Sequence, residues 1–206
     1  QEYSLHSHEP EALGVCGGRA QVFIHVLQPA ETLLVVGAGH VAQPLAQMAT
    51  LAGFRVLVVD DRAEFLSPER FPTAETRLVS FSELRSSVPL GRHTYVVIVT
   101  RSHEHDEEAL QQLLDQPVAY LGVIGSRTKV RRMFQRLRQA GHGEEQLARV
   151  RAPIGLEIGA ETPAEIAVSI VAELIQSHRG GSGRPLSEVL RAGQAAGPGA
   201  GEEAEP

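Results

Sequence analysis

A short glycine-containing loop constrains this chain more than any other feature. The motif GAGHVA at residues 37–42 follows an apolar run at residues 33–36 and opens a segment with helical periodicity. Asp60 ends the next apolar run, 21 residues after Gly39. A strand, a glycine turn, a helix and an acidic residue at the end of the second strand form the fingerprint of a dinucleotide-binding unit. We therefore predict a Rossmann-type fold.

Apolar runs and helical patterns alternate along residues 31–179, which is typical of parallel strands joined by crossover helices. The predicted strands cover residues 33–36, 55–60, 76–81, 94–100 and 119–124. The predicted helices cover residues 41–52, 82–87, 104–114 and 126–140, and a fifth begins at the capping sequence of residues 162–165. We expect an α/β fold: a doubly wound parallel sheet in three α/β/α layers, taken in the order 3-2-1-4-5.

The two ends of the chain differ from this central unit. Residues 1–30 are polar apart from one strand predicted at residues 21–27, and we expect them to be a linker or the remnant of a preceding domain. After Arg179 the composition is dominated by Gly, Ala, Ser, Pro and Glu. Such a segment buries too little apolar surface to offset its ordering entropy, so residues 180–206 are predicted to be a disordered tail.

Composition narrows the functional classes. The net charge of −6 gives no general attraction to nucleic acid, and no apolar run approaches the roughly 20 residues of a membrane span. Cys16 is the only cysteine, so there is no internal disulfide and we expect a reducing, cytoplasmic setting. Two glycines follow Cys16, and its thiol suits either a sulfur relay or an inert linker position.

The predicted topology brings polar residues together at one edge of the sheet. In the assumed strand order, the first and fourth strands are neighbours at the switch point where ligands bind. The candidate ligand-binding residues all follow strands: Gly37, Gly39, His40, Val41, Asp60, Asp61, Arg62, Thr100, Arg101, His103, Gly125, Ser126, Arg127 and Lys129. We expect them to line a crevice for a phosphorylated small molecule.

Each loop predicts a different contact. Gly39 lets a pyrophosphate approach the N–H groups of a helix N-terminus, and Asp60 is expected to accept hydrogen bonds from a ribose. His40 either contacts a phosphate or faces solvent. Four basic side chains are expected to form a positive rim on an acidic protein: Arg62, Arg101, Arg127 and Lys129.

The pair His103 and His105, with Asp106 beside it, has the form of part of a metal site. A catalytic metal needs further ligands from other strand ends, and none can be identified in the sequence. We assign no metal ligand and no catalytic residue, and expect these side chains to be polar loop or ligand-contact residues.

Six motifs in a fixed order resemble a known family. They are CGGR at 16–19, GAGHVA at 37–42, VVDDR at 58–62, TRSHEHD at 100–106, YLGVIGSRTK at 120–129 and APIGLEIGAETPAEIAVSI at 152–170. Over roughly residues 14–180 the chain looks like the C-terminal half of xanthine dehydrogenase accessory proteins, the XdhC/CoxI family. Arg101 stands where the family pattern has a small or neutral residue.

The resemblance implies a cofactor-binding chaperone rather than a catalyst. Members of the family bind the molybdenum cofactor, an anionic molybdopterin with a phosphate, and assist its sulfuration by a cysteine desulfurase. They deliver it to apo-xanthine dehydrogenase or a related molybdenum hydroxylase such as carbon monoxide dehydrogenase. A homodimer is one option for the assembly. The alternatives are an NAD(P)-dependent oxidoreductase, favoured by the glycine loop and Asp60, and a nucleotide-sensing regulatory domain.

Overall fold

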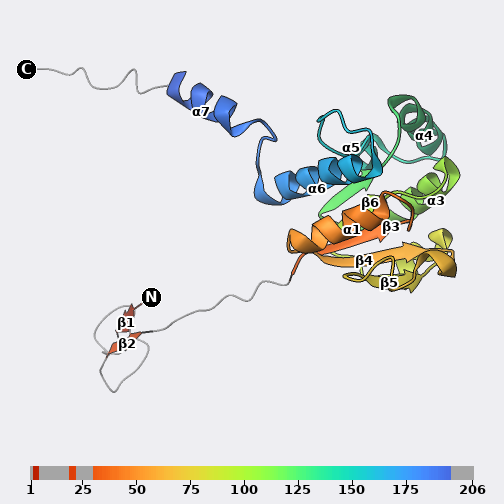
Figure 1. The fold of residues 1–206 in the computed structure, drawn as a ribbon, viewed down its shortest axis with the longest axis horizontal. Coiled ribbons are helices and arrows are strands. Elements are labelled where there is room, and N and C mark those ends of the chain that lie inside the picture. Colours follow the sequence, from red (N-terminus) through yellow and green to blue (C-terminus); the bar gives the residue numbers. More distant parts are fainter. Residues whose placement is uncertain (1, 5–18, 22–29, 196–206) are drawn as a thin grey trace, which may run out of the picture.

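A parallel sheet between two layers of helices forms the body of the protein (Figure 1). The computed structural model describes residues 2–4, 19–21 and 30–195. Six strands lie in the order β5-β4-β3-β6-β7-β8, and all neighbours are parallel. Their bounds are β3 (Thr32–Val36), β4 (Arg55–Asp60), β5 (Glu75–Leu78), β6 (Thr94–Ile98), β7 (Tyr120–Val123) and β8 (Val150–Arg151). The predicted α/β fold is confirmed, and β8 extends the expected order by one strand.

Alternating side chains of the central strands feed two separate cores. Leu33 and Val35 of β3 pack toward α1 (Ala42–Leu51) and α6 (Pro163–Arg179). Leu34 and Val36 face the opposite layer, because successive side chains of a strand point to opposite faces. That layer consists of α2 (Leu84–Ser87), α3 (His103–Leu113), α4 (Arg127–Gln139) and α5 (Glu144–Ala148). Burial on both faces explains why these strands are continuously apolar.

The predicted boundaries hold best where local signals are strong. Thr162 caps α6: its Oγ1 accepts from the Glu165 N–H at 3.3 Å, while the Glu165 carboxylate accepts from the Thr162 N–H at 2.9 Å. Gly180, with φ of 74°, ends the helix. The third strand is shorter than predicted, since β5 ends at Leu78 and Phe81 begins a 3-10 turn, η2 (Phe81–Glu83).

The ends of the described chain depart from expectation in one respect. The tail contains a helix, α7 (Leu186–Ala195), so the prediction of disorder is wrong over those residues. Leu186 and Leu190 stay 80% and 67% exposed, which agrees with the small apolar burial expected of this segment. Near the N-terminus β1 (Glu2–Ser4) pairs with β2 (Arg19–Gln21), and the strand predicted at residues 21–27 falls almost wholly outside the described residues.

Within the described part of the chain, no helix is both long enough and apolar enough to cross a membrane.

Candidate ligand-binding site

The carboxyl ends of three central strands meet at one level. Val36, the last residue of β3, is in register with Val59 of β4 and Ile98 of β6. The loop after β3 therefore passes between the ends of its two neighbours, as the predicted switch point requires. Gly37 makes this passage with φ of +107°, and a Cβ there would lie 2.5 Å from the Val99 carbonyl oxygen. Only glycine fits this position.

Gly39 lies in open space in front of α1. No heavy atom lies within 4 Å of the position that its Cβ would occupy. Val41, the N-cap residue just before α1, has no side chain that can cap the helix, and the first turn carries no acidic residue. The N-terminal N–H groups and the positive end of the helix dipole are thus left available to an anion, as the glycine motif predicts. His40 is exposed beside them.

Asp60 does not present its carboxylate to the crevice. It is 1% exposed, and its Oδ2 accepts from the Ala38 N–H at 2.7 Å. Its Oδ1 accepts from the Arg62 N–H at 3.1 Å and from Arg62 Nε at 2.8 Å, while Arg62 Nη2 donates to Oδ2 at 3.1 Å. Both oxygens already accept hydrogen bonds from the protein itself, so a hydrogen bond from a ribose would require Arg62 to release the carboxylate. In this conformation Asp60 holds the glycine loop in place.

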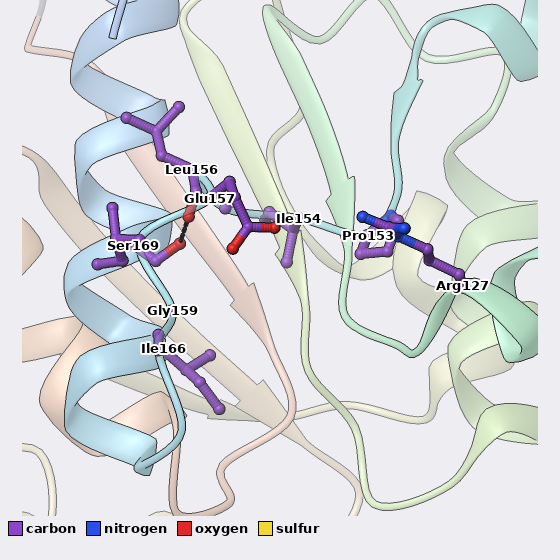
Figure 2. A pocket seen from close by; sticks show the side chains of 11 residues that line it. Arg127, Pro153, Ile154, Leu156, Glu157, Gly159, Ile166 and Ser169 are labelled. Atoms are coloured by element: carbon purple, nitrogen blue, oxygen red, sulfur yellow. Dashed lines mark hydrogen bonds between the residues drawn. The ribbon is translucent and has the colours of Figure 1, made fainter. Parts of the chain in front are cut away.

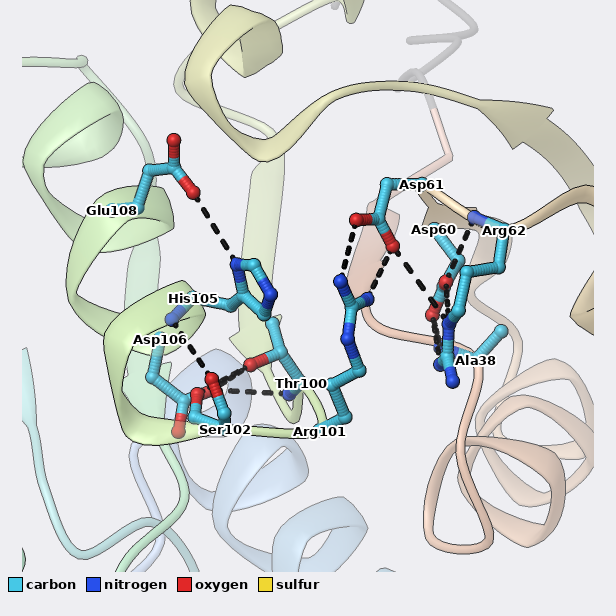
Figure 3. Close-up of polar contacts among 10 residues, drawn as sticks. All are labelled: Ala38, Asp60, Asp61, Arg62, Thr100, Arg101, Ser102, His105, Asp106 and Glu108. Atoms are coloured by element: carbon cyan, nitrogen blue, oxygen red, sulfur yellow. Dashed lines mark hydrogen bonds and ion pairs between the residues drawn. The ribbon is translucent and has the colours of Figure 1, made fainter.

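A second ion pair bridges the ends of β4 and β6 (Figure 3). Arg101 forms a bidentate contact with Asp61, with Nη2 donating to Oδ2 at 2.8 Å and Nη1 donating to Oδ1. The hydrogen bonds from Arg101 lower the pKa of Asp61 to about 2. Because β3 lies between β4 and β6, this bridge joins the two strands that flank β3.

Two of the four cations expected to form a positive rim are paired with carboxylates of the protein itself. Arg62 and Arg101 are neutralised by Asp60 and Asp61, and the Arg62 guanidinium also stacks 3.8 Å from the centre of the Phe65 ring. Two cations of the predicted rim form no ion pair with any carboxylate in the described residues: Arg127 and Lys129. Asp60 and Asp61, which directly precede Arg62 in the sequence, were the signal that part of the positive charge of the rim would be neutralised.

Asp106, which the sequence suggested as a polar loop or ligand-contact residue beside His103 and His105, lies in α3 and is buried. It is 8% exposed and accepts from the Thr100 N–H at 3.0 Å and from Thr100 Oγ1 at 2.6 Å, which ties the end of β6 to α3. Burial raises the pKa of Asp106 to about 6, opposed by these hydrogen bonds and by nearby Lys129 and His103. A carboxyl group with a raised pKa is thus hydrogen-bonded to the loop that begins at Thr100.

The two histidines of α3 do not converge. His103 Nε2 lies 2.8 Å from the Glu104 carboxylate, and His105 Nδ1 lies 3.4 Å from that of Glu108. His105 also packs against Phe81, with ring centres 5.3 Å apart. No cluster of three or more potential metal ligands occurs among the described residues.

The second glycine turn is capped by its own serine. Ser126 Oγ accepts from the Lys129 N–H at 3.3 Å, and a Cβ on Gly125 would make only ordinary contact with Val130 at 3.4 Å. One donor of the α4 N-terminus is therefore already used. The exposed side chains of Arg127 and Lys129 remain the cationic groups at this end of the sheet.

Beyond these loops the structure contains a pocket of about 320 Å³ that strand-end reasoning did not predict (Figure 2). The segment 153–160, which follows β8, forms most of its wall, and Arg127, Ile166 and Ser169 complete it. The motif APIGLEIGA of residues 152–160 carried the family resemblance, but its sequence alone indicated no spatial role.

Comparisons with known proteins agree with this architecture. Residues 33–174 match the family model described as the XdhC Rossmann domain. The chain belongs to this family. The Escherichia coli K12 protein YqeB, named as uncharacterized, is 44% identical over 78% of the chain and 30% of its own length. A Bacillus subtilis 168 protein, named as a probable xanthine dehydrogenase subunit, is 34% identical over 77% of the chain and 46% of its own length.

Two further relatives extend the comparison. The molybdenum cofactor insertion chaperone PaoD of E. coli K12 is 25% identical over 71% of the chain and 40% of its length. A crystal structure titled as a xanthine dehydrogenase from Bacillus halodurans superposes with a TM-score of 0.66 at 34% identity, covering 76% of this chain and 45% of that one. The chain thus spans less than half the length of each of these relatives.

Proposed function

We propose that this XdhC-family chain is the Rossmann part of a maturation factor that binds the molybdenum cofactor and assists its insertion into xanthine dehydrogenase or a related molybdenum hydroxylase. The observation that carries the proposal is family membership over residues 33–174, together with a relative named as a molybdenum cofactor insertion chaperone. The chain covers only part of each relative, so its partners belong to the proposal.

The phosphate of the cofactor would bind in front of α1. Gly39 leaves space there, and the helix N-terminus carries neither an acidic side chain nor a side-chain cap. An anion at such a position gains hydrogen bonds from the backbone and a favourable helix dipole. The remaining candidates, His40, Thr100, His103 and Lys129, would line the same edge of the sheet. The cofactor's own chemistry is that of a molybdenum-binding pterin, and the protein's part is to bind and present it.

The geometry supports an NAD(P)-dependent oxidoreductase less well. The acidic residue that would hold the adenosine ribose, Asp60, is buried and doubly occupied. His103, the one candidate for proton transfer to substrate, is exposed and paired with Glu104. Hydride transfer to a carbonyl needs a positioned proton donor. The glycine loop before α1, whose N-terminus has no side-chain cap, is the specific observation that favours the oxidoreductase as a second candidate.

The finer steps of maturation are part of the same proposal. Sulfuration of the cofactor would involve a cysteine desulfurase, delivery would involve the apo-hydroxylase, and both would take place in the cytoplasm. Cys16, the one candidate for a sulfur relay, lies outside the described residues. A homodimer is one assembly in which these steps could occur.

The test pairs two measurements on the purified protein. Mass spectrometry of the small molecules released from native protein should find a molybdopterin species, and equilibrium binding should show affinity for cofactor released from a molybdenum enzyme. A parallel screen should find no NAD(P)H oxidation with common carbonyl substrates. Dehydrogenase turnover without cofactor binding would replace the proposal with the oxidoreductase.

A further inference from the structure

The pocket beside segment 153–160 has a rigid frame. Leu156 is held to α6 twice, since its N–H donates to the Ser169 carbonyl at 3.2 Å and its carbonyl accepts from Ser169 Oγ at 2.6 Å. The Gly155 N–H donates to the Glu173 carboxylate. Gly155 also has φ of +105°, and a Cβ there would lie 2.4 Å from Ser169 Oγ. The segment is therefore fixed against α6 before any ligand arrives.

Ile154 anchors the other end of the same wall. Its N–H donates to the Val123 carbonyl at 3.1 Å, at the end of β7. Its side chain fills the space above Gly122, where a Cβ would lie 2.3 Å from Ile154 Cδ1. With Leu156 and Ile166, it gives the pocket apolar walls. Apolar walls that are held in place suit a flat ring, because little ordering entropy is lost on binding.

Two charged side chains reach this pocket without neutralising each other. Glu157 and Arg127 both line it, and Figure 2 shows the Arg127 guanidinium extending toward Pro153, with Ile154 drawn between it and the Glu157 carboxylate. Neither forms an ion pair with another described residue. The backbone N–H groups of residues 157–160 also donate to no acceptor in the described chain. The pocket thus offers one carboxylate that can accept two hydrogen bonds, that of Glu157, and several hydrogen-bond donors.

We infer that this pocket binds the 2-amino-4-oxopyrimidine edge of a fused ring, the edge that pterins and guanine share, with Glu157 as the residue that recognises it. That edge presents a ring N–H and an amino N–H side by side, followed by a carbonyl oxygen. The two oxygens of a carboxylate accept from the paired N–H groups, and Arg127 or a backbone N–H donates to the carbonyl. Ile154, Leu156 and Ile166 contact the ring faces.

The placement is compatible with a phosphate bound at Gly39. Ile166 of the pocket and Val41 at the start of α1 pack against the same apolar cluster between α1 and α6. Both sites therefore border this cluster. That the bound ring belongs to a pterin that also carries a phosphate rests on the proposed function. That the pocket recognises the 2-amino-4-oxopyrimidine edge rests on the pocket alone.

The experiment uses ring analogues that differ by one group. Pterin-6-carboxylate has the 2-amino group, and lumazine-6-carboxylate carries an oxygen in its place. The wild-type chain should bind the pterin at least about tenfold more tightly than the lumazine, because a carboxylate facing a carbonyl loses a hydrogen bond and meets a like partial charge. Glu157→Gln should weaken pterin binding by about tenfold and remove most of the discrimination. GMP should bind in the same Glu157-dependent way, and AMP should not.

Glu161→Gln is the matched control, since Glu161 is exposed one residue beyond segment 153–160 and does not line the pocket. Thermal unfolding should match between the two variants. Equal binding of pterin and lumazine, an unchanged affinity in Glu157→Gln, or no binding of pterin and GMP would each overturn the inference. Binding of released molybdenum cofactor separates it from the proposed function. If wild type and Glu157→Gln bind the cofactor equally, the proposed function holds and the inference about the pocket fails. If pterin and GMP bind in a Glu157-dependent way but the cofactor does not bind, the inference holds and the proposed function fails.

Discussion

The two sides of the crevice handle their polar groups in opposite ways. On the closed side, formed by Asp60, Asp61, Arg62 and Arg101, each charged group is paired with another group of the protein. On the open side, formed by Gly39, Arg127 and Glu157, a helix N-terminus and two charges have no described partner. Asp60 is buried and must be satisfied within the protein, whereas exposed groups such as Arg127 and Glu157 can stay unpaired at little cost. The closed side therefore shapes the loop, and the open side is free to bind.

The largest difference between the sides should come from their two glycines. Gly37→Val should destabilise the protein by about 3 kcal/mol or more, because it combines a positive φ with a Cβ that overlaps the backbone of Val99 and Thr100, just after β6. Gly39→Val should change the free energy of unfolding by less than about 1 kcal/mol, yet weaken binding of the phosphorylated ligand. Urea unfolding and ligand titration measure both effects. Equal stability of the two variants would break the comparison.

The aspartates of the closed side should differ from each other. Asp60→Asn should cost about 3 kcal/mol. It removes the charge that pairs with Arg62 at 2.8 Å and leaves that guanidinium only the longer contact to Asp61 at 3.8 Å, and it sets an NH2 group against the donors of Ala38 or Arg62. Asp61→Asn should cost less than about 1 kcal/mol, because its pair with Arg101 is solvent-exposed. Both values come from denaturant unfolding at one salt concentration. A cost for Asp61 as large as that for Asp60 would show that the bridge from β4 to β6 is a structural element of the fold.

On the open side, Arg127→Ala should weaken binding of the molybdenum cofactor by about tenfold to a hundredfold, the loss expected for one charge-assisted contact. Arg131→Ala is the control, since Arg131 is exposed on the same helix and does not line the pocket. Equilibrium titration compares the two. If both substitutions weaken binding equally, the effect is one of overall charge, and Arg127 makes no specific contact with the cofactor.

Asp106 should make stability depend on pH. Its pKa is raised in the folded protein to about 6, so the folded state holds a proton that the unfolded state has already lost between about pH 4 and pH 6. Stability should therefore fall as the pH rises through that window, by an amount on the order of 3 kcal/mol. Asp106→Asn should flatten this part of the profile. Parallel profiles for wild type and variant would mean that Asp106 ionises normally in the fold.

The smallest effect should come from removing α7. Truncation after Gly183 keeps the cap of α6 and should change the unfolding free energy by less than about 0.5 kcal/mol, since Leu186 and Leu190 of α7 are 80% and 67% exposed. A melting temperature that falls by several degrees would show that α7 packs against the rest of the protein.

Local patterns in the sequence determined the parts of this protein that depend on near neighbours. The glycine loop after β3, the apolar strands and the capping box of Thr162 and Glu165 could all be predicted, because periodicity and capping act within a few residues. The same signals placed the candidate residues at the carboxyl edge of the sheet. Even the family resemblance lay in the order of short motifs.

Only the tertiary structure decided which of those groups are free. Asp60 meets Ala38 across 22 residues of sequence, and Arg101 meets Asp61 across 40. The pocket exists because segment 153–160 folds back onto α6 and β7. Strand β8 is two residues long and has no periodicity to reveal it. Such contacts depend on distances between elements, which no local pattern encodes. They determine whether a charged side chain is paired within the protein or is free to bind a ligand.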